Sequence, residues 1–294
     1  MPITRRQSAL PGDNGRRPWG LVLAGLIGLV TVAPWAVRAT EAASSAYVTN
    51  AGSASVSVIS TATKTVLTTI SAGLGLTPEQ IAITPSGAFA YVANSGSNTV
   101  SVIATASNTV VGIPIPVGSN PIGIAITPNE ASAYVTNFGS IPGSVSVIDT
   151  ATKAVAGIPI PVGSNPVGIA ITPNGAFAYV ANFVSNTVSV IATVSNTVVG
   201  IPIPVGQRPD FLAVSPDGGS VYVPNQASNN VSVIATATNS VIGSPIPVGT
   251  APAGVAFTPV GIPVIPTLSD GALLLLLGTM AAALALRIVG RPIS

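Results

Sequence analysis

The chemistry open to this chain is limited first by the residue types that it lacks. Its 294 residues include no histidine and no cysteine, so the commonest general base, the commonest metal ligand and the usual haem ligand are missing. Its only methionines are Met1 and Met280, so thioether ligands are scarce as well. We therefore expect no cofactor and no metal site.

Two short segments concentrate the charge that is scarce elsewhere. They are Thr77–Gln80 and Gln207–Phe211, which stand where other copies of a repeated motif have uncharged linkers such as Ser119–Pro121. A site in a repeat protein is expected where the copies differ. The candidate binding residues come from these segments and from two nearby loops: Glu79, Gln80, Arg208, Asp210, Phe138 and Phe183. The alternative interpretation is a solvated surface ion pair, or simple drift between copies.

The charge distribution argues against nucleic acid as a partner. The formal net charge of +2 comes from arginines near the two ends, such as Arg5, Arg6 and Arg287. Residues 44–260 carry three basic and five acidic side chains, and they contain no basic stripe. Because nucleic-acid binding needs clustered lysine and arginine to displace counterions, we exclude that class of partner.

The elements that must position the candidate residues come from a repeat that occurs five times. Tyrosines open the copies at spacings of 43 to 45 residues: Tyr47, Tyr91, Tyr134, Tyr179 and Tyr222. In the second copy, turn residues separate four β-rich runs: Ala90–Asn94, Thr99–Ala104, Thr109–Val117 and Ile122–Thr127. Four short strands per repeat and a period in the forties predict an all-β fold, a five-bladed β-propeller of four-stranded antiparallel blades.

Proline predicts the order of strands within a blade. The proline-rich run, for example Ile113–Gly118, lacks backbone donors and should be the outermost strand. The run after it, for example Ile122–Thr127, should return to the axis as the innermost strand of the next blade. The last such run, Gly254–Thr258, is expected to pair with Tyr47–Thr49 and close a five-bladed ring. The alternative is an open ring that another subunit completes.

The repeat resembles the YVTN β-propeller repeat family. The motif YVTN stands at Tyr47–Asn50 and Tyr134–Asn137, and the other copies have YVAN or YVPN. TVSVI runs and PVG-x-x-P-x-G-I-A-I-T-P runs accompany it. The resemblance covers residues 46–259 and implies a propeller fold, but it implies no particular function.

Composition divides the chain into three parts. Residues 1–43 combine an arginine-rich start with the apolar stretch Trp19–Val37, which predicts a secretory signal peptide; the alternative is an uncleaved anchor. Residues 44–260 hold the repeats, which start near positions 46, 90, 133, 178 and 221. In residues 261–294, the segment 271–289 predicts a transmembrane helix followed by positive charge, with a buried core helix as the alternative.

The residues before this apolar segment resemble the IPTL-CTERM sorting signal of Gram-negative bacteria. The motif residues are Ile265, Pro266, Thr267, Leu268 and Ser269. Gly271 and Ala272 stand where that family has tryptophan and glycine. The resemblance implies a membrane anchor through the helix before processing, cleavage by an exosortase-like peptidase, and delivery to the cell surface. The repeats would then lie in the periplasm and later in the cell envelope or at the surface.

Three functions compete on this basis. The preferred hypothesis is an exported cell-envelope or surface propeller that is not an enzyme and acts as a binding or structural scaffold for protein or polysaccharide. One alternative is a lactonase-like hydrolase on a propeller scaffold, whose family implies convergent acidic, basic and histidine groups. The other is a redox-associated propeller module, for which haem or copper ligands are missing.

The termini of the mature protein test the predicted processing. If the signal is removed, N-terminal sequencing should begin after one of two small-residue sites, Val37–Ala39 or Thr40–Ala42. If the sorting signal is processed, the intact mass should also lack the region beyond the IPTL motif. A full-length chain in the cytoplasm would exclude both processing events.

Overall fold

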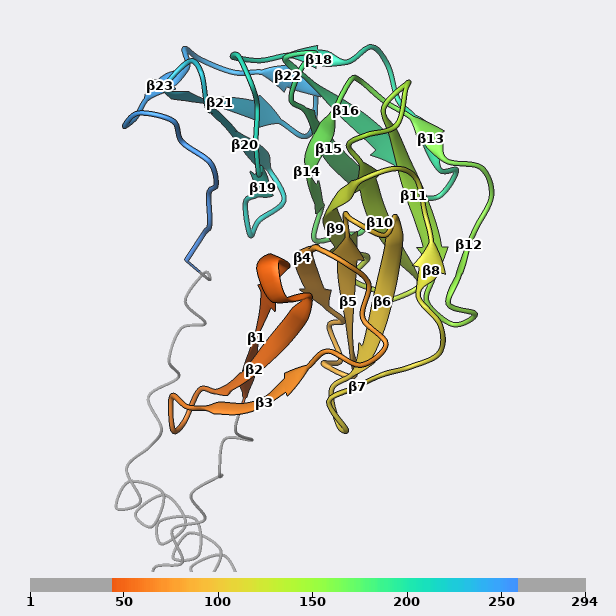
Figure 1. The fold of residues 1–294 in the computed structure, drawn as a ribbon. Coiled ribbons are helices and arrows are strands. Elements are labelled where there is room, and N and C mark those ends of the chain that lie inside the picture. The colour runs from red at the N-terminus through yellow and green to blue at the C-terminus, as the bar shows by residue number, and fades with distance from the viewer. Residues whose placement is uncertain (1–43, 259–294) are drawn as a thin grey trace, which may run out of the picture. The chain divides into compact units, whose positions relative to one another are not determined.

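The computed structural model describes residues 44–258, which form five antiparallel β-sheets and one short 3-10 turn, η1 (Ala51–Ser53) (Figure 1). The all-β class is confirmed for these residues. The predicted signal peptide (1–43) and the predicted sorting signal with its transmembrane helix (261–294) lie outside the described residues. Within residues 44–258, no helix is long and apolar enough to cross a membrane.

The five sheets follow the five repeats along the chain. The first sheet has three strands: β1 (Ser45–Asn50), β2 (Ser55–Ser60) and β3 (Val66–Ile70). The second and third contain β4 (Pro78–Ile83), β5 (Phe89–Asn94), β6 (Thr99–Ala104), β7 (Thr109–Val110) and β8 (Ile115–Pro116), then β9 (Pro121–Ile126), β10 (Ser132–Asn137), β11 (Ser144–Asp149), β12 (Ala154–Val155) and β13 (Ile160–Pro161). The fourth and fifth contain β14 (Pro166–Ile171), β15 (Phe177–Asn182), β16 (Thr187–Ala192), β17 (Thr197–Val198) and β18 (Ile203–Pro204), then β19 (Ala213–Val214), β20 (Ser220–Asn225), β21 (Asn230–Ala235), β22 (Ser240–Val241) and β23 (Ile246–Pro247).

The central hairpin of each sheet ends on the repeated asparagine. In the second sheet, β5 pairs with β6 from Phe89 to Asn94 without interruption. Asn94 is fully buried, and its Nδ2 donates to the hydroxyls of Thr99 (3.2 Å) and Ser101 (3.0 Å) on β6. The same cross-strand bond is made by Asn137, Asn182 and Asn225. The repeated asparagine therefore fixes the end of the hairpin.

The proline-rich run forms the outer edge, as predicted, but two short strands share that edge. β7 and β8 both pair with β6, with Thr109 opposite Ala104 and Pro116 opposite Thr99. Between them Gly112 has a φ of 72° and Pro114 has no N–H to donate, so the ladder is interrupted. The next run, β9, pairs with β10 as the innermost strand of the following sheet, which confirms the predicted strand order.

The sheets stack face to face, and an apolar cluster fills each interface between consecutive sheets. The cluster between the second and third sheets consists of Tyr91, Val100, Val102, Ile115, Ile124, Ala133, Val135 and Ile148. Equivalent clusters join the first sheet to the second, the third to the fourth and the fourth to the fifth. Both faces of the middle sheets are therefore buried, and β6 accordingly packs Val100 and Val102 into one interface and Ile103 into the other.

The repeated tyrosines bind each sheet to the next. The Tyr179 hydroxyl donates to Oδ1 of Asn239, in the turn before β22 of the fifth sheet, at 2.5 Å. Tyr47 makes the same bond to Asn108 of the second sheet at 2.5 Å. Asn108 and Asn239 have φ values of 53° and 50°, a left-handed conformation that asparagine tolerates better than most residues. Burial raises the pKa of Tyr179 to about 12, so this hydroxyl stays a donor at physiological pH.

The predicted closure of a five-bladed ring is wrong for this structure. β1 pairs with β2, while Gly254 forms a parallel bridge with Phe211 in the fifth sheet. The Phe211 N–H donates to the Ala253 carbonyl at 3.0 Å, and the Phe257 ring meets Tyr222 edge to face at 5.2 Å. The C-terminal segment follows directly from the fifth sheet, and these contacts hold it there. The five described sheets thus form an open series, with the first and fifth at its two ends (Figure 1).

A glycine-to-alanine exchange in an inter-sheet linker tests this packing. A Cβ added at Gly118 would lie 2.4 Å from Cγ of Asn137, which is fully buried. Gly118→Ala should therefore lower the free energy of unfolding by about 1–3 kcal/mol, as overpacking does in other cores. Urea denaturation measures the change. Gly52→Ala is the control, since nothing lies within 4 Å of an added Cβ there; equal midpoints for the two variants would refute the packing.

Candidate functional site

Three of the candidate residues, Glu79, Gln80 and Asp210, lie at the first strands, which are the innermost strands of the sheets. Consecutive first strands approach each other closely. A Cβ at Gly123 would lie 2.1 Å from the Val167 carbonyl oxygen, and one at Gly168 would lie 2.7 Å from the Asp210 carbonyl oxygen. Because no other residue allows this approach, the two glycines let the first strands line the axis of the series.

The inter-sheet linkers and the loops between second and third strands share one face, here called the mouth face. In the second sheet the Ser95 N–H donates to the Thr77 carbonyl at 2.9 Å, and the Gly96 N–H donates to the Leu76 carbonyl at 3.0 Å. These bonds place the linker before β4 beside the loop between β5 and β6. The segments that carry the candidate charges therefore open onto the same face.

A bulge in the first strand presents the acidic candidates. The β4–β5 register shifts between Pro78 and Ile81, so Glu79 and Gln80 face a single residue of β5. In the fifth sheet Asp210 holds the position that Glu79 holds in the second, because each follows the proline that pairs with the repeated asparagine. Glu79 and Asp210 thus occupy equivalent positions in two repeats. Aligning the repeats by that proline would have shown this from the sequence.

The fold shifts the pKa of the Asp210 carboxyl. The residue is only 8% exposed, and its backbone N–H donates to the Pro224 carbonyl at 3.0 Å. Burial raises the pKa of the Asp210 carboxyl above its ordinary value, although a hydrogen bond from the Phe211 backbone N–H opposes the rise. A buried carboxyl with a raised pKa is suited to accept a proton from a bound reactant.

Glu79 and Gln80 are engaged by neighbouring groups. Oε1 of Glu79 accepts a hydrogen bond from the Ser95 hydroxyl at 3.2 Å, beside the mouth face. Oε1 of Gln80 accepts one from the Ile124 N–H of β9 at 2.7 Å. Gln80 therefore joins the second sheet to the third, a structural role that the sequence did not reveal. Glu79 is half-buried and stays a candidate for contact with a ligand.

The remaining candidates form the rim of the mouth face. Arg208 is exposed, and its guanidinium carbon lies 5.6 Å from the centroid of the Phe183 ring, a cation–π contact. Phe138 is half-buried, and its carbonyl accepts a hydrogen bond from Nδ2 of Asn165 at 3.1 Å. The structure thus brings Arg208 and Phe183 together, a contact between two residues that the sequence had placed in separate loops.

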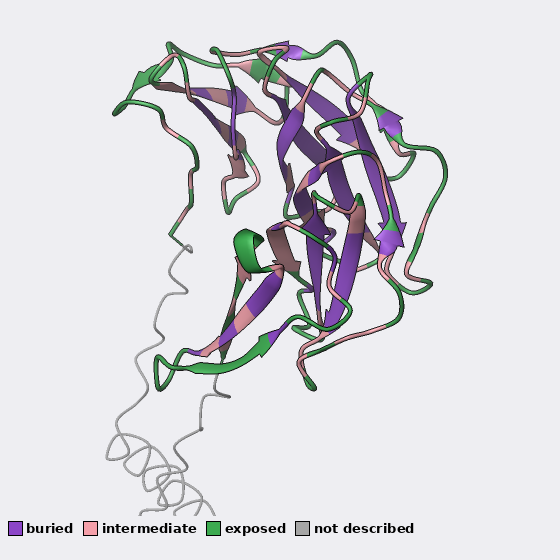
Figure 2. Cartoon of the chain, viewed as in Figure 1, coloured by how far each residue is buried: buried purple, intermediate pink, exposed green. Residues whose placement is uncertain are grey.

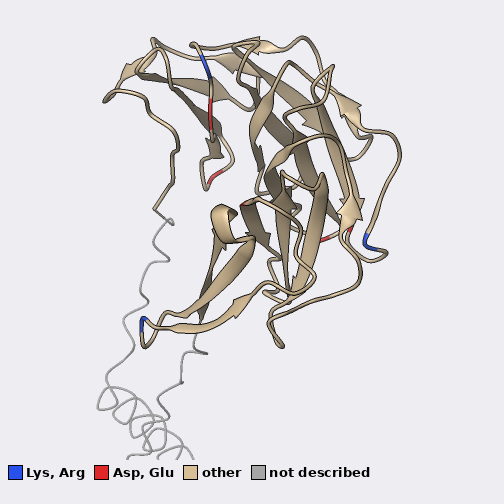
Figure 3. Cartoon of the chain, in the orientation of Figure 1, with Lys and Arg blue, Asp and Glu red and all other residues tan. Residues whose placement is uncertain are grey.

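The other three acidic residues of the described region serve turns on the opposite face. Glu130 accepts hydrogen bonds from the backbone N–H and the hydroxyl of Ser86 in the preceding sheet. Asp149 and Asp217 accept backbone N–H bonds within their own turns. Charged residues are therefore few and scattered (Figure 3). Within residues 44–258, no group of three or more acidic side chains is placed to hold a metal ion.

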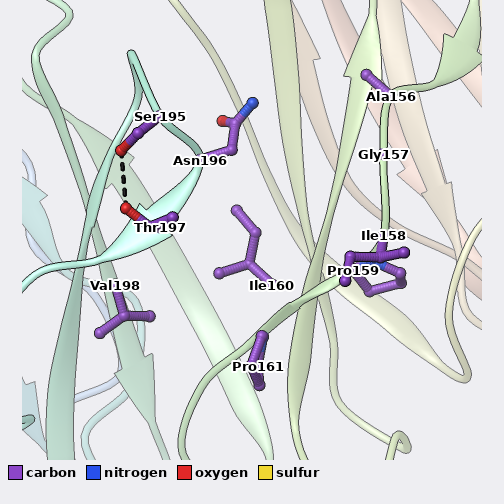
Figure 4. Close-up of a pocket in the computed structure, with 10 residues that line it drawn as sticks. All are labelled: Ala156, Gly157, Ile158, Pro159, Ile160, Pro161, Ser195, Asn196, Thr197 and Val198. Atoms are coloured by element: carbon purple, nitrogen blue, oxygen red, sulfur yellow. Dashed lines mark hydrogen bonds between the residues drawn. The ribbon is translucent and has the colours of Figure 1, made fainter.

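Two cavities among the described residues lie away from these carboxyls. One of about 660 Å³ opens at the outer rim between the third and fourth sheets, lined by residues 156–161 and 195–198 (Figure 4). A smaller one of about 310 Å³ occupies the same place between the first and second sheets. No titratable side chain lines either of these two cavities.

Comparison with known proteins supports the propeller fold. Residues 124–244 match the family described as "Lactonase, 7-bladed beta-propeller". No curated protein was found to match the chain. Kuenenia stuttgartiensis hydrazine synthase is similar with a TM-score of 0.54 and 20% identity, over 74% of this chain and 87% of that one. A functionally unknown protein from Desulfotomaculum acetoxidans DSM 771 gives a TM-score of 0.65 and 22% identity, over 72% and 68%. This chain is a β-propeller protein.

The lactonase match corrects the expectation that the chain is not an enzyme. It lies over the third and fourth sheets and most of the fifth, and it points to a possible hydrolase. The two structural neighbours, at 20% and 22% identity, bear on the fold alone. The scaffold role at the cell surface gains no support. The matching family also has seven blades, which differs from the predicted closed ring of five.

The pH dependence of stability tests the burial of Asp210. Its folded pKa is raised, so between the unfolded and folded pKa values the folded protein binds more protons than the unfolded chain. Stability therefore falls as the pH rises through the folded pKa. Asp210→Asn should raise the urea midpoint at pH 7 and lose this advantage near pH 3, below the ordinary aspartate pKa of about 3.9.

Asp217→Asn provides a control of opposite sign. The Ser215 hydroxyl and then the Gly219 N–H hold the pKa of Asp217 below its ordinary value, so this carboxylate stabilises the fold at neutral pH. The Asp217 variant should gain no stability at pH 7. An Asp210→Asn midpoint at or below that of the wild type at pH 7 would show that Asp210 carries no burial penalty.

Proposed function

We propose that this protein is a propeller hydrolase that opens lactones or closely related esters, with Asp210 as its general base. The proposal is carried by the buried Asp210 carboxyl and its raised pKa, in a chain of which residues 124–244 match a lactonase family. The chain has no histidine, so the base has to be another group. A carboxyl whose pKa is moved toward neutrality is the usual substitute.

The reaction is the addition of water to an ester carbonyl. The Asp210 carboxylate takes a proton from water as the water oxygen bonds to the carbonyl carbon. The tetrahedral oxyanion then collapses, the ring C–O bond breaks, and the leaving alkoxide receives the proton from Asp210. One water is consumed for each bond cleaved, and the product is a hydroxy acid. Asp210 returns to its charged form at the end of the cycle.

Arg208 and Glu79 are assigned to substrate binding. Among the described cations, Arg208 belongs to a linker of the mouth face, whereas Lys64 and Lys153 stand in turns of the opposite face. Its contact with Phe183 holds the guanidinium at the rim, where its N–H donors suit a carbonyl or carboxylate oxygen. Glu79, at the equivalent bulge of the second sheet, accepts hydrogen bonds and suits a hydroxyl-bearing substrate.

A panel of five- and six-membered lactones and simple aryl esters tests the proposal with the full chain. Turnover should follow a kcat/KM profile that rises with pH through a pKa above the ordinary aspartate value. Asp210→Asn should lower kcat about 10²–10⁴-fold, the usual contribution of a general base. Asp217→Asn, on the opposite face, should leave kcat unchanged. Absence of turnover on every substrate, or equal loss in both variants, would eliminate the proposed base.

The cellular address of the protein remains part of this proposal. Support comes from the arginine-rich and apolar residues of 1–43 and from the IPTL motif at 265–269. On this basis the protein is exported, held at the inner membrane through residues 271–289, and processed by an exosortase-like peptidase before it reaches the envelope or surface. A hydrolase at that address would act on substrates outside the cytoplasm.

A further inference from the structure

The leading face of a sheet, meaning the face turned toward the next sheet, is uncovered in the fifth sheet. In the three middle sheets an isoleucine of the proline-rich strand is buried on this face: Ile115 (5% exposed), Ile160 (4%) and Ile203 (6%). In the fifth sheet Ile246 has this position and is 45% exposed. Val231 and Val233 of β21 share the face and are only half-buried. Among residues 44–258, the surface that binds a next sheet is thus present and nothing covers it.

The trailing face of the first sheet, turned away from the second, is uncovered in the same way. Val48 is 43% exposed and Val66 is 58% exposed. The counterparts of Val48 in the four later sheets are all 0% exposed: Val92, Val135, Val180 and Val223. Figure 2 shows the contrast, with exposed colour on β1, β3 and β23 and buried colour through the middle sheets.

In the part of the chain that the structure describes, the first sheet also lacks the innermost strand that the later sheets have. The segment 252–258 has the form of such a strand. Ala251, just before it, has the φ of 51° that Asn120 has before β9, and a proline follows in both cases. Phe257 packs on Tyr222, in the place where a next sheet begins. Within the described residues the segment bridges to Phe211 on one side, and its other edge has no strand partner.

We propose that a second copy of this chain covers these surfaces. The trailing face of its first sheet packs on the leading face of the fifth sheet, and segment 252–258 of one copy adds to β1 of the next as the missing innermost strand. In the register of β9 and β10, where Ile124 faces Val135, Val255 of one copy faces Val48 of the other. The contact is head to tail, so it builds a ring or an open chain of copies.

Two details favour a second copy over an unrelated partner. Gly75, Gly118, Gly163 and Gly206 each lie against the repeated asparagine of the next sheet, within 2.7 Å of an added Cβ. Gly249, their counterpart in the fifth repeat, has nothing within 4 Å, and Asn50 of a second copy fits that space. Tyr222 is the tyrosine of the fifth repeat, and no further sheet follows it among the described residues. In a second copy, the Thr61 carbonyl holds the position of the Thr150 carbonyl, which accepts a hydrogen bond from the Tyr91 hydroxyl, so it could accept one from Tyr222.

Contact between two copies also requires no change in the four interfaces between the sheets of one copy. The two uncovered faces lie at opposite ends of the series (Figure 1). Closure within one chain would require the four existing interfaces to change their geometry. Association of two copies adds a fifth interface of the same composition and leaves the four unchanged. The exposed valines and isoleucine of the two faces suit burial between two copies.

Cysteine pairs test the proposed register, because the natural chain has no cysteine. The full chain carrying Val48→Cys and Val255→Cys, in a mild detergent, is treated with a short thiol cross-linker. Linked dimers and larger species are expected, and two single-cysteine variants should link only when mixed. Val48→Cys with Val194→Cys, a 95% exposed position on an outer turn, is the control and should not link. A cross-linked monomer would establish closure within one chain. Absence of any link would exclude the addition of segment 252–258 to β1, and either result would overturn the proposal.

A charge on the leading face provides the second test. Ile246→Glu should fold, because the side chain is already 45% exposed, but it should raise the dissociation constant of the assembly at least tenfold. Sedimentation velocity of the full chain in the same detergent measures the species present. Ile158→Glu is the control, since Ile158 is 86% exposed on the outer edge, away from both faces. A wild-type chain that is monomeric at 100 µM, or an Ile246 variant that associates like the wild type, would overturn the proposal.

Discussion

Burial of each sheet against its neighbours is the constraint on which this fold depends. A single sheet of short strands cannot build a core alone, and the central strands here are buried on both faces. Fully burying one valine or isoleucine contributes on the order of 1.5–3 kcal/mol, and each interface contains several such side chains. Stability therefore resides between the sheets, and the tyrosine bonds add the alignment that apolar contacts do not provide. Any sheet with one bare face is correspondingly weaker.

Most of the architecture could be predicted because each strand carries its own local signal. Proline excludes the IPIPVG run from the sheet interior, and the run led by Tyr91 consists mostly of apolar residues, as a buried strand requires. The partner of each tyrosine could not be predicted, since Asn239 lies 60 residues beyond Tyr179 and no local pattern connects them. The prediction of ring closure failed for a related reason. Closure depends on the sum of the angles between consecutive sheets over four interfaces, and no single motif in the chain specifies that sum.

The candidate site shows the same division between local and long-range information. Charge against a neutral background is what drew attention to Glu79, Arg208 and Asp210. What the residue type could not show was the use that the fold makes of each one. Gln80 accepts a hydrogen bond that joins the second sheet to the third. Asp210 has a raised pKa because a bulge places its carboxyl in a buried position. The exclusion of enzymatic function from the missing histidine gave too little weight to what burial does to a carboxyl.

The uncovered end of the series and the proposed base are physically linked. Asp210 precedes Phe211, and the Phe211 N–H is bound by the carbonyl of Ala253 in the C-terminal segment. This is the segment that adds to β1 of a second copy under the proposed assembly. Pairing on its free edge would hold the segment more firmly against Phe211, and the bulge with Asp210 would lose freedom to move. Assembly would also place a sheet beside the fifth one and extend the wall around the axis. Asp210 is already buried with a raised pKa in the single copy, so assembly would add rigidity to the base, and the two proposals meet at one short stretch of backbone.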